Sequence, residues 1–319
     1  MNSAAQALQT LQLRTIAAIG NVFETSSVVG RYSTVTFSQN DAGHVSYGRA
    51  QVSLKSGNLG RLLQAYVTAA GAAYVTAIQP YVPRALALDV GLDTDRYFQN
   101  LLRAAADDSV MRAVQDAYFD ANYLMPAVDT AARLGIHSAL GAAVVYDSYV
   151  QGSFPAIRAL TDAAVGGMPG TDEHRWVAAY VAQRRNWLLS RRGDLATSVY
   201  RMDAFQAMIQ MNLWNLDLPM VVRGQEISST TLSAPPPDCF NNDHPPGSRP
   251  LAWTAGGSVL RGLDVRHLQV GLSQTLPTVT ADGVFGPGTR DALKAYQSAN
   301  HLPATGSADA ALVLAVARP

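Results

Sequence analysis

The sequence predicts a mainly α-helical protein that contains one small β-hairpin and ends in a three-helix bundle. Apolar residues recur at helical spacing through most of the chain, and alternation of apolar and polar residues is confined to residues 32–51. Prolines and turn-forming residues are concentrated at residues 233–250. We therefore predict a large domain at residues 1–232, a linker at 233–250 and a small domain at 251–319.

Composition and net charge restrict the kinds of partner that the protein is expected to bind. Hydrophobic residues make up 48% of the 319 residues and charged residues 15%, which is typical of a folded globular protein. The 24 basic residues balance the 24 acidic ones, so no net field attracts the chain to nucleic acid or to an anionic membrane. We expect a monomer that binds any polymer partner through local contacts.

Cysteine and histidine usage argues against a metal site, and no cofactor motif is found. Cys239 is the only cysteine, so no intramolecular disulfide can form. The six histidines show no metal-ligand spacing such as HExxH, and no glycine-rich phosphate loop occurs. Residues 1–20 lack the pattern of a signal peptide, and no segment has the ~20 apolar residues of a membrane span. We expect synthesis in the cytoplasm.

The large domain is predicted to be helical except for the hairpin. In the hairpin, Val35, Phe37, Val45 and Tyr47 alternate with polar residues around a turn with the sequence QNDAG. Apolar residues at helical spacing predict the helices, at residues 59–67, 110–121, 137–150, 172–191 and 199–214.

The small domain shows apolar stripes at helical spacing in residues 263–274 and 286–300, and a third short helix is predicted at 307–316. The segment Asp282-Gly283-Val284-Phe285-Gly286-Pro287 separates the first two helices. Asp282-Gly283 favours a tight turn, Phe285 would fill the small core, and a proline is tolerated in the first turn of a helix. We expect a shallow groove near this loop.

This domain resembles the peptidoglycan-binding-domain-1 family. The resemblance covers the whole tail and is based on the LQ, DGxFGPxT and YQ motifs, which occur at residues 268–269, 282–289 and 296–297. The resemblance implies a three-helix bundle that binds the bacterial cell wall.

Two carboxyl groups in the first fifty residues suggest glycosidase chemistry. Glu24 lies near the end of the first predicted helix, and Asp41 lies in the hairpin turn. A glycosidase needs one carboxylic acid to protonate the leaving oxygen and one carboxylate to activate water, and inversion requires the wider separation of the two. An acid at a helix end and another in a turn are common, so the neighbouring sequence has to support the pair.

The surrounding sequence, NVFETSSVVGRYSTVTFSQNDAGHVSYGRAQVSLKSGNLGRLL, resembles the chitosanases of glycoside hydrolase family 46. QDAYFDANYLMPAV at 115–128, GIHSALGAAVVYDSYVQGSF at 135–154 and NLDLP at 215–219 extend the resemblance across most of the large domain. The resemblance implies a two-lobed, lysozyme-like fold with Glu24 as general acid and Asp41 as general base. Ser46 stands where the family has a Thr that positions the attacking water, and it keeps the hydroxyl.

The resemblance also implies an ionic network behind the acid. Asp147, Arg184 and Arg201 fall at its positions, although the run YVAQRRNWLLSRR allows a slip from Arg184 to Arg185. Such a network would fix the Glu24 rotamer and tune its proton affinity.

One position departs from the family. Chitosanases have an Asp shortly after the hairpin that binds the substrate ammonium, and Asn58 occupies that position here. A neutral amide loses the charge-assisted bond but suits an N-acetyl group. With the wall-binding tail, this difference favours peptidoglycan over chitosan. His44, beside Asp41, is a further candidate for sugar contact.

The sequence thus predicts an inverting hydrolase of the β-1,4-linked peptidoglycan glycan. A chitosanase is the alternative, and a wall-binding protein with an inactive hydrolase domain is a second. Action in the periplasm or cell wall would require release as a phage lysin or delivery as a secreted effector.

Overall fold

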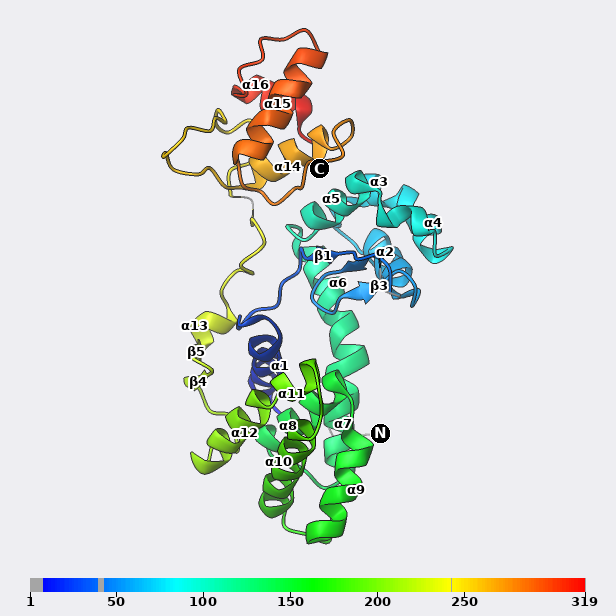
Figure 1. The fold of residues 1–319 in the computed structure, drawn as a ribbon, viewed down its shortest axis with the longest axis vertical. Coiled ribbons are helices and arrows are strands. Elements are labelled where there is room, and N and C mark those ends of the chain that lie inside the picture. The colour runs from blue at the N-terminus through cyan, green and yellow to red at the C-terminus, as the bar shows by residue number, and fades with distance from the viewer. Residues whose placement is uncertain (1–7, 40–42, 242, 319) are drawn as a thin grey trace. The chain divides into compact units, whose positions relative to one another are not determined.

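A computed structural model describes residues 8–39, 43–241 and 243–318 of the chain (Figure 1). The chain forms two compact units: residues 1–30 with 119–234, and residues 31–118 with 235–319. We call the first the helical unit and the second the mixed unit. The fold is mainly helical with small antiparallel sheets, which confirms the predicted fold class. No helix formed by the described residues combines the length and apolar character needed to cross a membrane.

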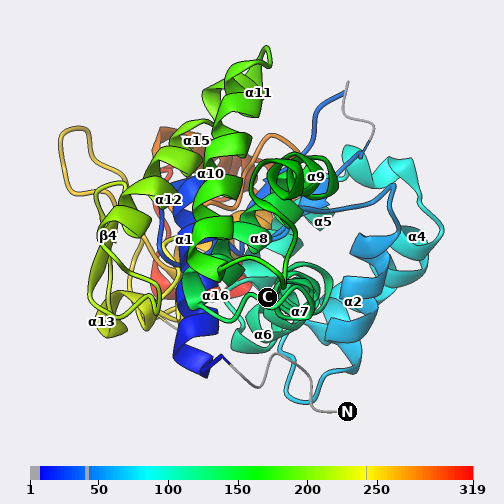
Figure 2. The same cartoon turned by 90° about the horizontal axis from the view of Figure 1, so that it is seen from below.

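The helical unit is built around one buried helix, α8 (Ala139–Gln151). Residues 139–148 of α8 are all buried, as expected for a helix that is apolar on every side. Figure 2 shows its neighbours around it. They are α1 (Thr10–Thr25), α7 (Met125–Arg133), α9 (Phe154–Val165), α10 (Glu173–Leu189) and α12 (Tyr200–Gln210).

The remaining elements of the helical unit are short. A π-helical turn, η4 (Asp120–Leu124), precedes α7, and the others are α11 (Asp194–Thr197), β4 (Met220–Val222), β5 (Gln225–Ile227) and α13 (Ser229–Leu232). Ser138 caps α8 and Asp172 caps α10, each accepting a backbone N–H bond in the first turn. These caps explain why the predicted helices at 137–150 and 172–191 begin one or two residues later.

The mixed unit contains a three-stranded antiparallel sheet where the sequence predicted a hairpin. Strand β1 (Val35–Thr36) pairs with β2 (Ser46–Tyr47) as predicted, and Val35 lies opposite Tyr47. The addition is β3 (Val52–Ser53), which pairs with β2 so that Ser46 faces Ser53. The third strand was missed because two residues are too few to produce an alternating pattern.

Helices cover this sheet and complete the N-terminal part of the mixed unit. They are α2 (Asn58–Thr68), α3 (Val75–Ile78), η2 (Gln79–Tyr81), α4 (Val82–Leu86), η3 (Val90–Asp93), α5 (Arg96–Ala105) and α6 (Ser109–Phe119). Their apolar side chains form one buried cluster with the sheet residues Val45 and Tyr47.

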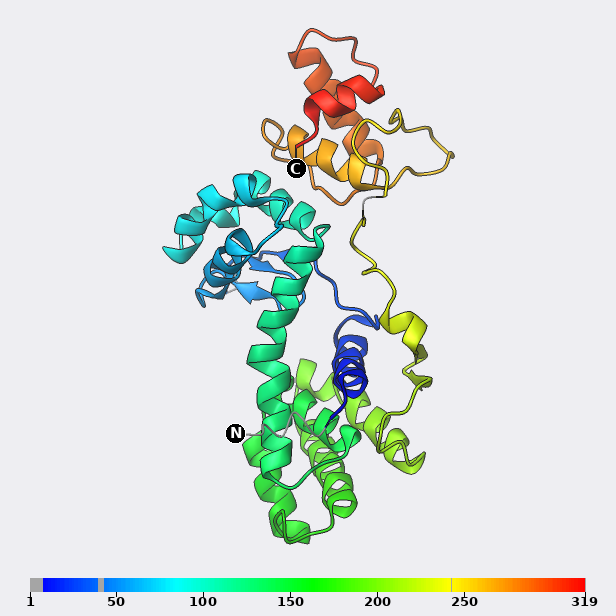
Figure 3. The ribbon, with the colours of Figure 1, turned by 180° about the vertical axis from the view of Figure 1, so that it is seen from behind.

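The C-terminal part of the mixed unit, which we call the module, contains the predicted helices α14 (Leu263–Leu272), α15 (Pro287–Ala299) and α16 (Ala310–Val316), coloured orange to red in Figure 3. Phe285 is fully buried, which confirms its predicted place in the core. Two glutamines hold the connecting loops: Gln269 accepts a hydrogen bond from Gly283 N at 2.8 Å, and Gln297 accepts one from Gly306 N at 2.9 Å. These glutamines belong to the LQ and YQ motifs.

The module packs directly against α5 and the turn that follows it in its own unit. Arg266 of α14 forms an ion pair with Asp107 at 2.9 Å, and both side chains are 3% exposed. Val270 and Ala281 of the module belong to the same buried cluster as the sheet. The segment before the module also binds this unit, because Asp238 accepts hydrogen bonds from Tyr32 N and Ser33 N. The predicted boundaries at 232 and 251 stay a prediction, and the compact units divide the chain elsewhere.

A buried histidine makes this contact sensitive to pH. His267 Nε2 lies 2.7 Å from the Tyr74 hydroxyl, and burial, reinforced by the charge of Arg266, lowers the pKa of His267 to about 4. In the unfolded chain its pKa is about 6.5, so between these values the unfolded state binds the proton and the folded state does not. The contribution of His267 to stability is therefore complete above pH 6.5 and is lost as the pH falls towards 4.

We expect His267→Gln to remove this pH dependence, because the amide can accept the Tyr74 bond and does not titrate. The free energy of unfolding of both proteins should be measured from pH 7 to pH 4. The wild type is expected to lose more stability than the variant over this range. Parallel curves would show that His267 does not titrate on unfolding.

Candidate active site

Glu24 lies in the last turn of α1, where the helix leaves the core. Its neighbour Phe23 is buried and makes edge-to-face contacts with the rings of Tyr200 and Phe205. The Glu24 side chain is 48% exposed. The core therefore fixes the backbone here while the carboxyl group stays accessible to a substrate.

Arg201 of α12 connects Glu24 to the interior. Its Nη2 donates to Glu24 Oε1 at 2.7 Å, and its Nη1 donates to Asp147 Oδ1 at 2.8 Å. Burial lowers the pKa of Arg201, but the charges of Asp147 and Glu24 outweigh burial and raise it above its ordinary value. The guanidinium is thus a permanent charge that holds one Glu24 oxygen and leaves the other available.

Asp147 of α8 joins two arginines. Its Oδ2 accepts from Arg184 Nη1 at 2.6 Å, and the same nitrogen donates to Ser148 Oγ at 2.8 Å. Arg185 instead pairs with Asp203 at the surface. The structure thus brings Glu24, Arg201, Asp147 and Arg184 into one chain of hydrogen bonds, with Arg184 rather than Arg185 as its inner member.

The second group of candidate residues lies in the mixed unit, beside strand β2. Ser46 is buried, and its hydroxyl donates to His44 O at 3.4 Å. His44 Nδ1 lies 2.6 Å from Asp93 Oδ2, and Val45 N donates to Asp93 Oδ1 at 2.8 Å. Asp93 therefore holds both the histidine side chain and the backbone that leads into Ser46.

The general base predicted for this region, Asp41, lies outside the described residues. His44 adopts a left-handed backbone conformation with φ of 60°, so the chain turns sharply as it enters β2. Asp93 stabilises this turn, and Asp41 lies three residues before it in the sequence.

Asn58 is the first residue of α2 and is half-buried. Its Oδ1 accepts a hydrogen bond from Arg61 Nη1 at 3.0 Å. The position where the resemblance implies a carboxylate thus presents an amide with a neighbouring guanidinium. No group of three or more His, Cys, Asp or Glu side chains in the described part of the chain is placed to hold a metal ion.

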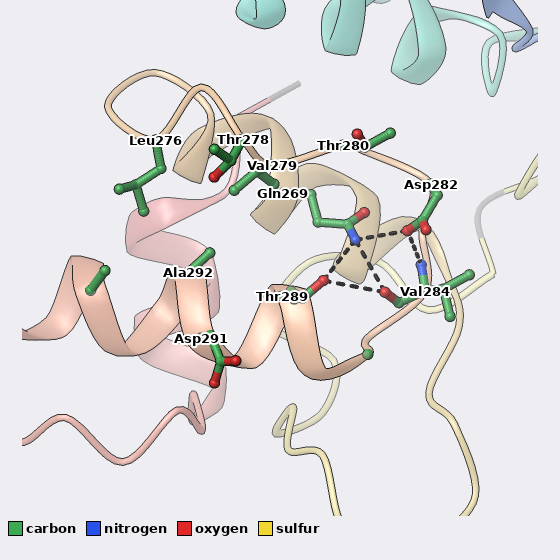
Figure 4. Close-up of a pocket in the computed structure, with 13 residues that line it drawn as sticks. Gln269, Leu276, Thr278, Val279, Thr280, Asp282, Val284, Thr289, Asp291 and Ala292 are labelled. Atoms are coloured by element: carbon green, nitrogen blue, oxygen red, sulfur yellow. Dashed lines mark hydrogen bonds between the residues drawn. The ribbon is translucent and has the colours of Figure 1, made fainter.

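The module contains a separate groove of about 600 Å³ beside α15 (Figure 4). Gln269 lies at its base, where Nε2 donates to Asp282 Oδ1 at 2.8 Å and to Thr289 Oγ1 at 2.9 Å. Leu276, Thr278 and Ala295 also line it, so the groove combines apolar and hydroxyl surfaces. It lies beside the DGxFGP loop, where the sequence predicted a shallow groove.

Family comparisons agree with this geometry. The model described as glycosyl hydrolase family 46 matches residues 18–220, more than half of the chain, and this range includes Glu24 and the arginine network. The chain belongs to glycosyl hydrolase family 46. A second family model, described as a peptidoglycan binding domain, matches residues 261–315.

Curated and solved members of family 46 are similar to most of the matched region. The chitosanase of Bacillus subtilis strain 168 is 28% identical over 233 residues, which cover 67% of this chain and 83% of the relative. The native chitosanase of Bacillus subtilis MY002 is 25% identical with a TM-score of 0.56, covering 68% of this chain and 95% of that chain. A Gynuella sunshinyii family 46 chitosanase bound to chitotetraose shares the fold, with a TM-score of 0.56, 24% identity and coverage of 69% and 98%.

One residue beside the candidate site, Asp93, could not be found from the sequence pattern. It lies 49 positions after His44, in a turn where acids are common, so no spacing pattern indicated its role. Only the fold brings its carboxylate to the start of β2. Its importance is visible only in the structure, where Asp93 is buried, because carboxylates are rarely buried without a specific partner.

Proposed function

We propose that this family 46 hydrolase cleaves β-1,4 bonds of chitosan, with Glu24 as general acid and Asp41 as general base. The observation that carries the proposal is the half-exposed Glu24 carboxyl at the end of a buried arginine–aspartate network, within the family match. The similar proteins named above are chitosanases, and a mutant of one was crystallised with six GlcN units. These similarities support chitosan, the alternative substrate predicted from the sequence, more strongly than they support peptidoglycan.

In the proposed mechanism, Glu24 protonates the leaving oxygen while Arg201 fixes the orientation of its carboxyl group. Asp41 accepts a proton from the attacking water, which the Ser46 hydroxyl positions. Water attacks the face opposite the leaving group, so the anomeric configuration inverts. Asp93 acts through the backbone, because it holds the turn at His44 and Val45 that leads into Ser46.

Peptidoglycan is the second candidate substrate, and two observations favour it. The module matches a peptidoglycan binding domain and contains a groove of about 600 Å³. The amide of Asn58 beside Arg61 also replaces the carboxylate expected to bind a substrate ammonium. Under this proposal the groove binds the wall polymer, and the enzyme reaches the wall by cell lysis or specialised secretion.

One experiment distinguishes the two substrates. The purified protein should be incubated separately with soluble chitosan and with purified peptidoglycan, and the products identified by mass spectrometry. Release of glucosamine oligomers is expected. Release of muropeptides with new reducing ends, without chitosan cleavage, would reject the proposal in favour of the second candidate.

We expect Asn58→Asp to increase the preference for chitosan. A carboxylate at this half-buried position would attract a glucosamine ammonium by about 0.2–1 kcal/mol, which corresponds to at most about fivefold in kcat/KM. Gln64→Glu, which adds the same charge at an exposed position of α2, is the matched control and should have little effect. Equal changes in the two variants would indicate a general charge effect instead of a local contact.

A further inference from the structure

One wall of the module's groove has no regular secondary structure of its own. Residues 279–282 pass along the groove between α14 and α15 without forming a helix or strand. On the groove side, Asp282 is bound by Gln269 of the module, as Figure 4 shows. Val279 N donates to Leu276 O at 3.1 Å within the module, but Val279 O and Ala281 N are bonded from elsewhere, because buried peptide groups need partners.

That partner is Asn100, a fully buried residue of α5. Its Nδ2 donates to Val279 O at 2.9 Å, and its Oδ1 accepts from Ala281 N at 2.9 Å. The primary amide thus bonds the segment as a neighbouring β-strand would, with one donor and one acceptor. Arg96, one turn earlier on α5, donates to Pro277 O at 3.3 Å and extends the contact.

The clamped segment is also part of the core that supports β2. Ala281 is fully buried and belongs to the apolar cluster that contains Tyr47 and Leu59. The same short segment therefore presents Thr278, Val279, Thr280 and Asp282 to the groove and its other side to the core of the mixed unit. A shift of the segment would alter both.

We infer that Asn100 is a positioning residue for polymer binding by the module. The groove has its binding shape only when α5 holds residues 279–281, and polymer bound there occupies a fixed place relative to the sheet that carries Ser46. The module is then a rigid extension of the mixed unit, and not an anchor on a flexible linker. This inference rests on the proposed role of the groove in binding wall polymer.

Variants of the 319-residue chain test this inference by co-sedimentation with purified peptidoglycan. Asn100→Ala removes both bonds to the segment and is expected to weaken binding about tenfold or more. Gln115→Ala is the matched control, since Gln115 is a buried amide on α6 that donates to Tyr32 O at 3.2 Å and accepts from Arg49 N at 2.9 Å, with no bond to the clamped segment. The affinity of this control for peptidoglycan should lie within about twofold of the wild-type affinity. Thermal unfolding should confirm that each variant is folded during the assay.

Asn100→Asp provides a pH-dependent measurement, which is compared with thermal unfolding of the same variant at each pH so that recovery of binding by a variant that is folded throughout is assigned to the segment. The ionised carboxylate still accepts from Ala281 N but repels Val279 O, whereas the protonated carboxyl donates to Val279 O again. Binding by this variant should therefore recover as the pH falls through its carboxyl pKa, while wild-type binding shows no matching step. This test remains valid if Asn100→Ala does not fold.

Ala295→Trp separates this inference from the role of the groove. Ala295 is exposed and lines the groove, so tryptophan should block it without disturbing the core. Loss of binding in Ala295→Trp with wild-type binding in both Asn100 variants would overturn the inference and leave the groove's role standing. Wild-type binding in Ala295→Trp would reject the groove as the binding site, and the inference with it.

Discussion

Glu24→Gln is expected to lower kcat by about 10²- to 10⁴-fold, because general acid catalysis contributes that much and an amide cannot donate the proton. The substitution keeps the size of the side chain, and its carbonyl oxygen can still accept from Arg201 Nη2, which binds Glu24 Oε1 at 2.7 Å in the wild type. The fold should therefore remain intact. Steady-state hydrolysis of soluble glucosamine oligomers, with circular dichroism of the same samples, measures both effects.

Glu226→Gln is the matched control for this prediction. Glu226 is an exposed residue of β5, so the same chemical change there should leave kcat within about twofold of the wild type. A Glu24→Gln variant that hydrolyses substrate at the wild-type rate would show that the acid lies elsewhere. The assay must exclude contaminating hydrolase, for example by parallel purification of the control.

Asp147→Ala is expected to produce the largest loss of stability in the helical unit. Asp147 is 2% exposed and accepts from Arg184 and Arg201, whose side chains are 1% and 4% exposed. Removing the carboxylate leaves two buried guanidinium groups without their shared counter-ion. Breaking a buried ion pair in this way costs about 3–5 kcal/mol of unfolding free energy.

Urea unfolding at neutral pH should detect this loss directly. The control is Asp203→Ala, which removes an arginine partner of the same type at the surface, where the side chains of Arg185 and Asp203 are 36% and 50% exposed. Exposed pairs contribute about 0.2–1 kcal/mol, so the control should remain close to the wild type. Similar losses in the two variants would mean that burial of the Asp147 network does not determine its contribution.

Much of the helical unit could be predicted from the sequence because its signals are local. Helical spacing predicted both ends of α8 and α10 to within two residues. Resemblance to family 46 then placed Asp147 and Arg201 together, and only the choice between Arg184 and Arg185 needed the structure. Helix geometry decides that choice, because adjacent residues on a helix point in directions about 100° apart.

The mixed unit was harder to predict because its contacts join distant parts of the chain. Asn100 binds a segment about 180 residues away, and Asp93 binds His44 across 49 residues. Neither contact leaves a periodic pattern in the sequence. The proline-rich stretch at 233–250 suggested a linker that separates two domains, since prolines disfavour helices and β-ladders. In the structure, however, Asp238 within this stretch accepts hydrogen bonds from the backbone of Tyr32 and Ser33.

The discontinuous core of the mixed unit constrains when this enzyme can become active during its own synthesis. Tyr47 packs in a cluster with Val270 and Ala281, residues that the ribosome adds more than two hundred positions later. Translation adds about 5–20 residues per second, so many seconds separate synthesis of the sheet that carries Ser46 from synthesis of Val270 and Ala281, which complete its core. The helical unit, which ends at Ala234, can complete its contacts before residues 270–281 have emerged. Nascent chains should therefore order Glu24, the proposed acid, before Ser46, the proposed water-positioning residue, and hydrolysis should begin only after residues 270–281 have left the ribosome.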